Sequence, residues 1–189
     1  DEILVTGFTC SAVIEPIIFH NAKPVYIDIE LNSFSLDTNL IKKSLTNKTR
    51  AIIVQHSFGI RAKIEHIKKI INNRNIIIIE DCAHCIEGER DGIKPGQLSN
   101  AALFSFYATK NITSGEGGAI VTDDSYLYHK LLKFRTHGMT TGVAERHSTK
   151  YKHWDMEVLG YNCKMSDIQA SLLLPQLKNI EKYLKIREN

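Results

Sequence analysis

Cysteine is scarce in this sequence, and long apolar runs are absent. Four cysteines occur among 189 residues, too few for the disulfide framework of a small secreted fold, and this indicates a reducing compartment. No apolar run approaches the roughly 20 residues that a membrane-spanning helix needs, and no signal-peptide pattern is visible. We therefore expect a cytoplasmic location and no membrane partner.

Charge of one sign is not in excess either. The 24 Lys and Arg residues against 21 Asp and Glu residues give a formal net charge of +3. Lys42, Lys43, Lys68 and Lys69 recur near predicted helix ends, where lysines are typical of solvated helix faces. We therefore expect no nucleic-acid partner. The hydrophobic share of 43% is ordinary for a globular domain with a core of its own.

Short apolar runs alternate with helical patterns along most of the chain. Strands are predicted at 3–5, 24–29, 50–55, 76–79, 101–107 and 119–122, and helices at 11–21, 37–45, 64–71 and 123–134. The run at 76–79 is apolar on both faces, which predicts a strand that helices cover on both sides. This alternation indicates an α/β fold with a mostly parallel sheet flanked by helices.

The last part of the chain has a different pattern. Ser166 and Gln169 form an S-x-x-Q capping box, which predicts a long helix through Leu184 with a kink at Pro175. Residues 137–160 are polar and lack periodicity, so we predict a long loop that provides a binding surface or a subunit contact. We therefore divide the chain into an α/β domain at 1–160 and a long helix at 161–189.

The stretch IIIIEDCAHCIEG, residues 76–88, offers two candidate sites. Cys82 and Cys85 form a C-x-x-C pair that would open a helix after a strand, where reactive dithiols occur; small buried cysteines are the alternative. No second pair lies at zinc-ligand spacing, so we predict no metal site. Asp81 projects from the carboxyl end of a strand, where open α/β sheets bind ligands. A helix N-cap is the alternative role for Asp81.

The stretch LFSFYATKNITSGEGGAI, residues 103–120, contains a single lysine, Lys110. A solvated surface lysine is one interpretation. Lys110 lies in an uncharged, glycine-rich turn after a strand, however, and partial desolvation of this kind makes a lysine amine available as a nucleophile. The glycines match neither the G-x-x-x-x-G-K-[ST] nor the G-x-G-x-x-G pattern, so a nucleotide fingerprint is not supported.

Asp81 and Lys110 together suggest a site for pyridoxal 5'-phosphate. This cofactor needs a lysine for covalent attachment and an acid that keeps its pyridine nitrogen protonated. It also needs hydrogen-bond donors for its phosphate, and Ser105 is placed for that role. Of the two candidates in the stretch 76–88, we therefore favour the acid over the thiols.

Six segments of the chain resemble one known family, the DegT/DnrJ/EryC1/StrS sugar aminotransferases. The fold that this resemblance implies is the large domain of the pyridoxal-phosphate-dependent transferase fold type I, which is like aspartate aminotransferase. Each segment is weak evidence alone, and the combination is specific. The segments are DEILVTGFTCSAV, AKPVYIDIELNSFSLD, HSFG at 56–59, EDCAH at 80–84, FSFYATKN…GEGGAI at 104–120 and GYNCKMSDIQAS at 160–171.

The resemblance assigns a role to each matching residue. Lys110 is the lysine that attaches the cofactor and moves the substrate's α-proton, and Asp81 pairs with the ring nitrogen. His84 lies near the ring hydroxyl, and Ser105 holds the phosphate. Asn162 resembles an asparagine that reaches the cofactor phosphate of a neighbouring subunit, which implies a homodimer with shared active sites.

The chain also departs from the family pattern. Cys10 stands where many members stack an aromatic residue on the cofactor ring, so a softer sulfur contact would replace the stacking. Lys164 stands where arginine is usual, which keeps the charge without the bidentate fork. The family's phosphate-binding Gly-Thr turn would lie before residue 1 and its small C-terminal domain after residue 189, so we expect a part of a longer enzyme.

The implied reaction is transfer of an amino group, with glutamate as donor and 2-oxoglutarate as product, to a nucleotide-linked keto-sugar in the biosynthesis of surface polysaccharides or related amino-sugars. Sugar dehydratases form one branch of the family and carry histidine at the position of Lys110, so the lysine favours transamination. A dehydratase remains an alternative, as do a thiol oxidoreductase and a non-catalytic α/β binding module.

Overall fold

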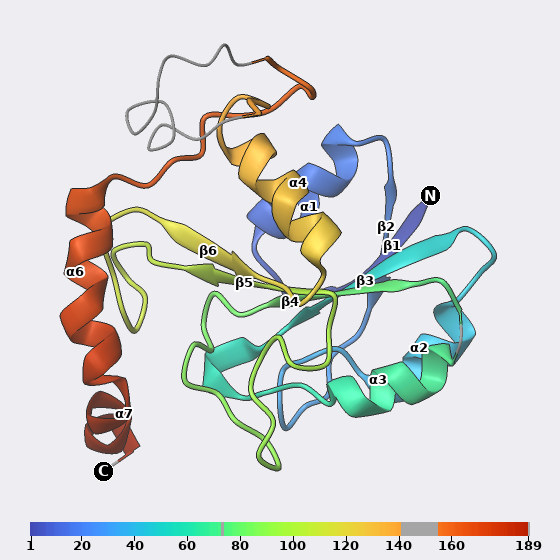
Figure 1. Cartoon of the computed structure of the whole chain (residues 1–189). Coiled ribbons are helices and arrows are strands. Elements are labelled where there is room, and N and C mark those ends of the chain that lie inside the picture. The colour runs from blue at the N-terminus through green and yellow to red at the C-terminus, as the bar shows by residue number, and fades with distance from the viewer. Residues whose placement is uncertain (73, 141–154, 189) are drawn as a thin grey trace.

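One six-stranded sheet organises the computed structural model, which describes residues 1–72, 74–140 and 155–188 (Figure 1). Its strand order is β2-β1-β3-β4-β5-β6. The first five strands along the chain pair in parallel, and β6 is antiparallel to β5. The strands are β1 (Glu2–Thr6), β2 (Lys23–Ile27), β3 (Thr49–Gln55), β4 (Ile77–Asp81), β5 (Ala101–Ser105) and β6 (Gly118–Val121). The predicted α/β class is confirmed.

Helices lie on both faces of this sheet and at one of its edges (Figure 1). One face carries α1 (Ser11–Phe19) and α4 (Ser125–Arg135), and the other carries α2 (Thr38–Ser44) and α3 (Ile64–Ile71). The short 3₁₀ helix η1 (Ser57–Gly59) follows β3. The last helices, α6 (Asp167–Lys178) and α7 (Ile180–Glu188), stand at the end of the sheet where β5 finishes.

The main core lies between the sheet and the pair α2 and α3. Leu4, Ile52 and Ile78 from three neighbouring strands pack against Ile41 and Ile64 from the two helices, and all are at most 2% exposed. Each such side chain stabilises the fold by about 1.5–3 kcal/mol through removal from water. The apolar positions that predicted these elements are therefore the ones that hold them together.

The opposite face of the sheet is covered less completely than the sequence predicts. Helices lie on both sides of the strand at 76–79, as predicted, but Ile77 is 47% exposed while Ile78 beside it is 2% exposed. The reason lies in the covering helices: α4 buries none of its residues and α1 buries only Ile17. The apolar composition of a strand alone does not show how much of a sheet face the neighbouring helices cover.

Polar caps start three helices where the sequence places them. The Asp37 side chain accepts a hydrogen bond from the Asn39 amide at 2.9 Å, and Asp124 accepts one from Leu127 at 3.0 Å. Ser166 and Gln169 form the predicted capping box at the start of α6. Each cap pairs a backbone N–H group that would otherwise lack a partner in the first helical turn.

The predicted long C-terminal helix is two helices, and the break is not at Pro175. Pro175 lies inside α6, which ends at Lys178. Asn179 causes the break: its side-chain amide donates to the Pro175 carbonyl at 2.7 Å, and its backbone amide bonds to Gln176 instead. An asparagine that competes in this way for backbone partners ends a helix.

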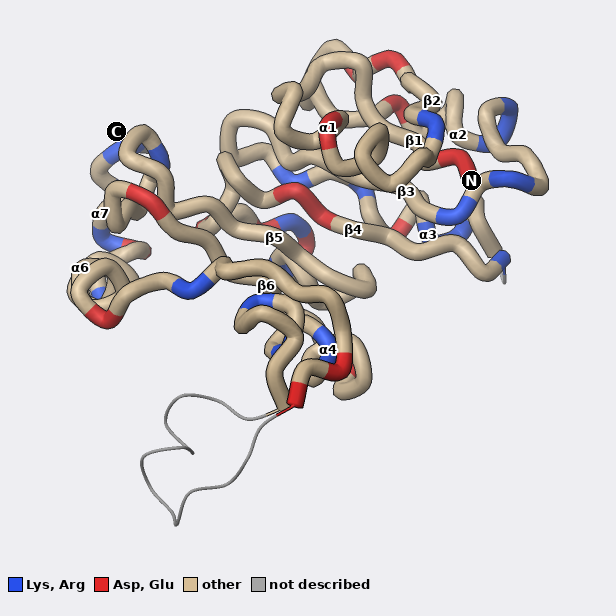
Figure 2. Tube along the Cα trace, turned by 90° about the horizontal axis from the view of Figure 1, so that it is seen from above, with Lys and Arg blue, Asp and Glu red and all other residues tan. Residues whose placement is uncertain are grey.

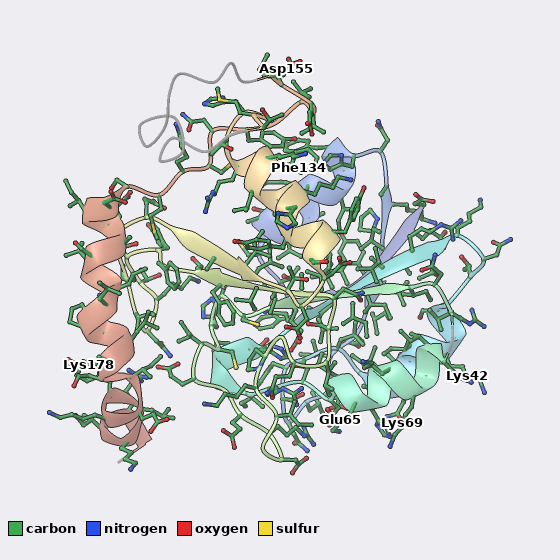
Figure 3. All side chains as sticks on the ribbon, in the orientation of Figure 1. Lys42, Glu65, Lys69, Phe134, Asp155 and Lys178 are labelled. Carbon is green, nitrogen blue, oxygen red and sulfur yellow. The ribbon has the colours of Figure 1, made fainter. Side chains whose placement is uncertain are left out.

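Charged residues of both signs are spread over the trace (Figure 2). The four lysines that predicted solvated helix faces are exposed, and Figure 3 shows Lys42 and Lys69 directed away from the sheet. Within 1–72, 74–140 and 155–188, no helix combines the length and apolarity that a membrane crossing requires. Most of the predicted loop at 137–160 lies outside the described residues.

Candidate active site

The predicted site residues lie at the carboxyl edge of adjacent central strands. Asp81 ends β4 and Ser105 ends β5, and these strands pair in parallel with Asp81 opposite Leu103. Lys110 follows β5 in a turn, in which its amide donates to the Tyr107 carbonyl at 3.0 Å. Parallel pairing brings both strand ends to the same edge, so the acid and the amine share one end of the sheet.

His84 connects the acid and the amine. The Lys110 Nζ lies 3.0 Å from His84 Nε2. Partial burial of the ring and the nearby Lys110 ammonium lower the pKa of His84, while the Asp81 carboxylate acts to raise it. His84 is therefore in the electrostatic field of both predicted catalytic groups, and its lowered pKa makes Nε2 an acceptor for the Lys110 amine near neutral pH.

The donor set fits pyridoxal phosphate. Among the described residues, the Asp81 carboxylate receives one hydrogen bond, from the Ala83 amide to Oδ1 at 3.0 Å, so Oδ2 can meet a protonated ring nitrogen. The Ser105 hydroxyl oxygen accepts from the Tyr107 amide at 3.3 Å, and its own proton can go to a phosphate oxygen. An acid, an amine and a hydroxyl are the groups that this cofactor requires.

Two further predicted residues lie outside this cluster. Cys10 is exposed at the N-terminus of α1 and makes no side-chain cap hydrogen bond. The hydroxyl of its neighbour Thr9 donates to the side chain of Gln55, and Gln55 of β3 pairs with Asp81 of β4, so the turn before α1 lies at the same edge of the sheet. Asn162 instead forms a β-bridge with Thr136, beyond the end of α4. Its contact with a neighbouring subunit's cofactor stays a prediction.

The C-x-x-C pair does not have the surroundings of a reactive dithiol. Cys82 and Cys85 are each 1% exposed. Burial raises the pKa of the Cys85 thiol to about 11 and that of Cys82 further still, which suppresses the thiolate that redox chemistry needs. The expected helix after the strand is a turn, closed by the Cys85 amide on the Cys82 carbonyl at 3.0 Å. Because a turn and not a helix follows β4, Asp81 is not a helix N-cap.

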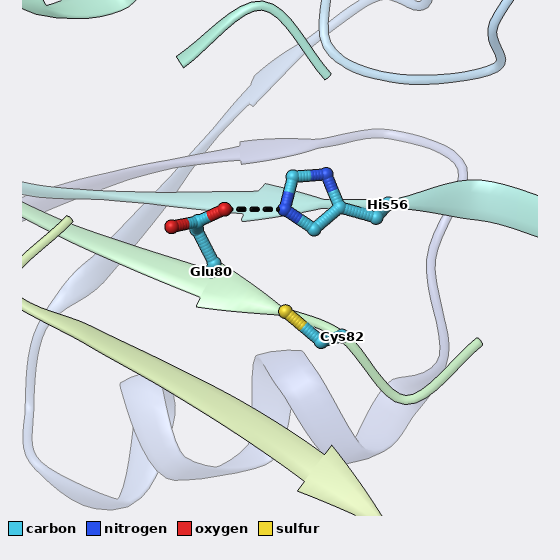
Figure 4. Close-up of side chains that lie close together, drawn as sticks. All are labelled: His56, Glu80 and Cys82. Atoms are coloured by element: carbon cyan, nitrogen blue, oxygen red, sulfur yellow. Dashed lines mark hydrogen bonds and ion pairs between the residues drawn. The ribbon is translucent and has the colours of Figure 1, made fainter. Parts of the chain in front are cut away.

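A fully buried pair that the sequence reasoning missed lies directly beside Asp81. His56 Nε2 is 2.6 Å from Glu80 Oε2, and both side chains are 0% exposed (Figure 4). The His56 Nδ1 accepts the Ala62 amide at 2.9 Å, so the ring proton lies on Nε2 and is donated to Glu80. Burial acts to raise the pKa of Glu80, but hydrogen bonds from His56, Ser99 and Gly96 outweigh it and the pKa is lowered.

This pair holds strand ends together and is a poor metal site. Donor atoms of His56, Glu80 and Cys82 lie within 4.8 Å of one another. A metal on His56 Nε2 would displace the proton on that nitrogen. Nδ1 already accepts from the Ala62 amide, so the ring would carry no proton on either nitrogen and would be an anion. Both Glu80 oxygens already accept hydrogen bonds. The only sequence signal for the pair was the presence of HSFG and EDCAH among the family-like segments.

Comparison with known proteins places the chain among enzymes that modify sugars. The profile described as the DegT/DnrJ/EryC1/StrS aminotransferase family matches residues 1–189. The chain is 37% identical over its whole length to the uncharacterized protein MJ1066 of Methanocaldococcus jannaschii, of which it covers 49%. It is 32% identical over 97% of its length to GDP-perosamine synthase of Escherichia coli O157:H7, covering 48%. The chain thus spans about half the length of these relatives.

Solved structures share the fold. The putative sugar aminotransferase Spr1654 from Streptococcus pneumoniae, in its PMP form, superposes with a TM-score of 0.89 at 28% identity, covering 100% of this chain and 52% of that one. The E. coli GDP-4-keto-6-deoxy-D-mannose-3-dehydratase with bound hydrated PLP superposes with a TM-score of 0.87 at 27% identity, covering 100% and 50%. The predicted type I transferase fold is confirmed.

Proposed function

Because the chain belongs to the DegT/DnrJ/EryC1/StrS aminotransferase family, we propose that the full-length protein is a pyridoxal-phosphate-dependent aminotransferase that converts a nucleotide-linked keto-sugar into an amino-sugar. The observation that carries this proposal is the contact of 3.0 Å between Lys110 Nζ and His84 Nε2, with Asp81 close enough to influence His84. The named relatives that act on nucleotide-linked sugars support the substrate class.

Each residue at the edge has a defined task. Asp81 places a negative charge where a basic ring nitrogen would take a proton, and Ser105 donates to the phosphate. Lys110 provides the amine for attachment, and His84 holds that amine in place by accepting its hydrogen at Nε2. When bound, pyridoxal phosphate takes up the electron pair that remains on the substrate carbon after its proton leaves.

Proton movement is the second task of Lys110. Lys110 is a half-buried residue in a turn without other lysines. When its amine is not attached to the cofactor, it could take a proton from the α-carbon of the amino donor and give it back at a second position. His84 is suited to receive hydrogen bonds from the amine in this cycle because its lowered pKa keeps the ring uncharged near neutral pH.

The remaining parts of the proposal concern the whole protein. We propose glutamate as the amino donor, 2-oxoglutarate as its product, and a homodimer in which Asn162 reaches the neighbouring subunit's site. We also propose a cytoplasmic location, and Cys10 as a soft contact to the cofactor ring.

A dehydratase is the second candidate, because the E. coli dehydratase shares the fold over the whole chain. The two reactions differ in their products: a transaminase yields an amino-sugar, whereas a dehydratase removes a hydroxyl group from the sugar. Lys110, at the position where that branch carries histidine, favours the transaminase.

The test is the glutamate half-reaction of the full-length protein loaded with pyridoxal phosphate. We expect glutamate alone to convert the cofactor to pyridoxamine phosphate and to release one 2-oxoglutarate per site. Lys110→Ala should abolish this conversion, while Lys182→Ala, which changes an exposed lysine on α7, should not. Conversion that persists in Lys110→Ala at the parental rate would refute the assignment.

A further inference from the structure

A carboxylate close to the active site links three segments that are distant in sequence. Glu87 is 7% exposed at its side chain. Its Oε2 accepts a hydrogen bond from Asn111 Nδ2 at 2.9 Å, and its Oε1 pairs with Arg187 of α7. A nearly buried carboxylate is stable only with such partners. We call this set of contacts, Asn111–Glu87–Arg187, the Glu87 bridge.

The Glu87 bridge runs alongside the active-site contact. Glu87 is three residues after His84, and Asn111 directly follows Lys110. The turn after β4 and the turn after β5 are therefore joined twice, once by the contact between Lys110 and His84 and once by the bond between Asn111 and Glu87. The second link restrains the backbone on which the reactive amine is carried.

The C-terminal helices support the same turn from the outside. Gln176 of α6 accepts the Thr113 amide at 3.0 Å and donates to the Thr113 carbonyl at 2.8 Å. Ile112 packs against Leu173 in a small buried cluster. Without the Glu87 bridge, these contacts would hold the far end of the turn. The end at Lys110 would then depend on the bond from its amide to the Tyr107 carbonyl and on the contact of its side chain with His84.

We propose that Glu87 is a positioning residue, which holds the Lys110 amine against His84 through Asn111 and is itself fixed by Arg187. A lysine side chain has four rotatable bonds, so the site of its amine depends on restraint of the backbone and of its neighbours. Misplacement of a reacting group by 1 Å can cost about 100-fold in rate. The catalytic meaning of this role rests on the proposed function, but the restraint itself does not.

The first test follows His84 in cofactor-free, full-length protein by NMR titration of its imidazole. The charged groups that act on this ring are Lys110 and Asp81. Glu87→Ala should let the Lys110 turn move away, which removes burial and a positive charge from the ring and raises the pKa of His84 toward about 6.5. Glu87→Gln should shift the titration less than Glu87→Ala, because its amide oxygen can still accept from Asn111 although its NH2 group cannot pair with Arg187.

The second test measures how fast an amine-reactive acylating reagent modifies Lys110. We expect several-fold faster modification in Glu87→Ala, and also in Asn111→Ala, which breaks the bridge from the other side. Glu89→Ala is the matched control because it removes a carboxylate from the same segment at an exposed position. It should leave Lys110 at the parental rate.

These readouts separate the inference from the proposed function. With cofactor added, Glu87→Ala should attach pyridoxal phosphate at Lys110 at least about 10-fold more slowly than the parent. If the parent protein attaches no pyridoxal phosphate, the proposed function fails. The His84 titration and the Lys110 labelling rate still test whether Glu87 restrains the Lys110 turn. If folded Glu87→Ala and Asn111→Ala both keep the parental His84 titration and Lys110 labelling rate, the positioning role is wrong.

Discussion

Replacing His56 should destabilise the fold strongly, because the change leaves two buried groups without a partner. In His56→Leu, Glu80 loses the hydrogen bond to Oε2 and the Ala62 amide loses its acceptor. A hydrogen bond to a charged group contributes about 1.5–3 kcal/mol, and a buried donor left unpaired costs about 1–3 kcal/mol. We therefore expect a loss of about 3–5 kcal/mol, the scale known for breaking a buried pair.

Urea unfolding at neutral pH measures this loss. With a slope of about 2 kcal/mol per M, a loss of about 3 kcal/mol lowers the midpoint by about 1.5 M. His66→Leu is the matched control, since His66 is exposed on α3 and should change stability by less than about 0.5 kcal/mol. A loss below about 1 kcal/mol in His56→Leu would refute the hydrogen-bond network that we describe.

Acid provides an independent check on the same pair. The pKa of Glu80 is lowered in the folded state from its ordinary value of 4.5, so its contribution to stability is present above pH 4.5 and is lost as the pH falls through the folded-state pKa. The parent should therefore lose stability in this acid range more steeply than His56→Leu. Parallel curves for the two proteins would contradict this interpretation of Glu80.

Three other changes test separate parts of the structure. Asp81→Ala should still permit covalent attachment of the cofactor but slow the glutamate half-reaction by about 100-fold or more, the effect of removing one electrostatic contact. Arg61→Met should raise the melting temperature by about 2–4 °C, because Arg61 is fully buried with Nε and Nη2 unpaired among the described residues, and only Nη1 reaches Glu65, at 3.5 Å. Replacing both Cys82 and Cys85 by alanine should leave attachment at the parental level if the thiols only pack, and loss of attachment in a folded variant would restore the thiol hypothesis.

The sequence predicted most elements of the sheet and the position of the acid and the amine, because these depend on local patterns. The apolar run before Asp81 and the turn around Lys110 are both read within a few residues. Capping by Asp37 and Asp124 was predictable for the same reason. Each of these features is determined by residues that are neighbours along the chain.

What could not be predicted depends on contacts between distant residues. The bond between His56 and Glu80 joins positions 24 residues apart, and the Glu87 bridge reaches 100 residues, to Arg187. The break at Asn179 was missed because Pro175 is the stronger local signal, although the competing side chain decided the outcome. Exposure of Ile77 depends on how far α1 and α4 cover the sheet, which apolar composition does not report.

The most direct test of the central claim is to reduce the cofactor-loaded, full-length protein with borohydride and to map the modified peptide. Reduction makes the link between pyridoxal phosphate and its lysine permanent, so the labelled residue identifies the amine that attaches the cofactor. We predict label on Lys110 alone, in the peptide that contains FSFYATKN. Label on any other lysine, or a protein that binds the cofactor without labelling, would contradict the assignment of the site.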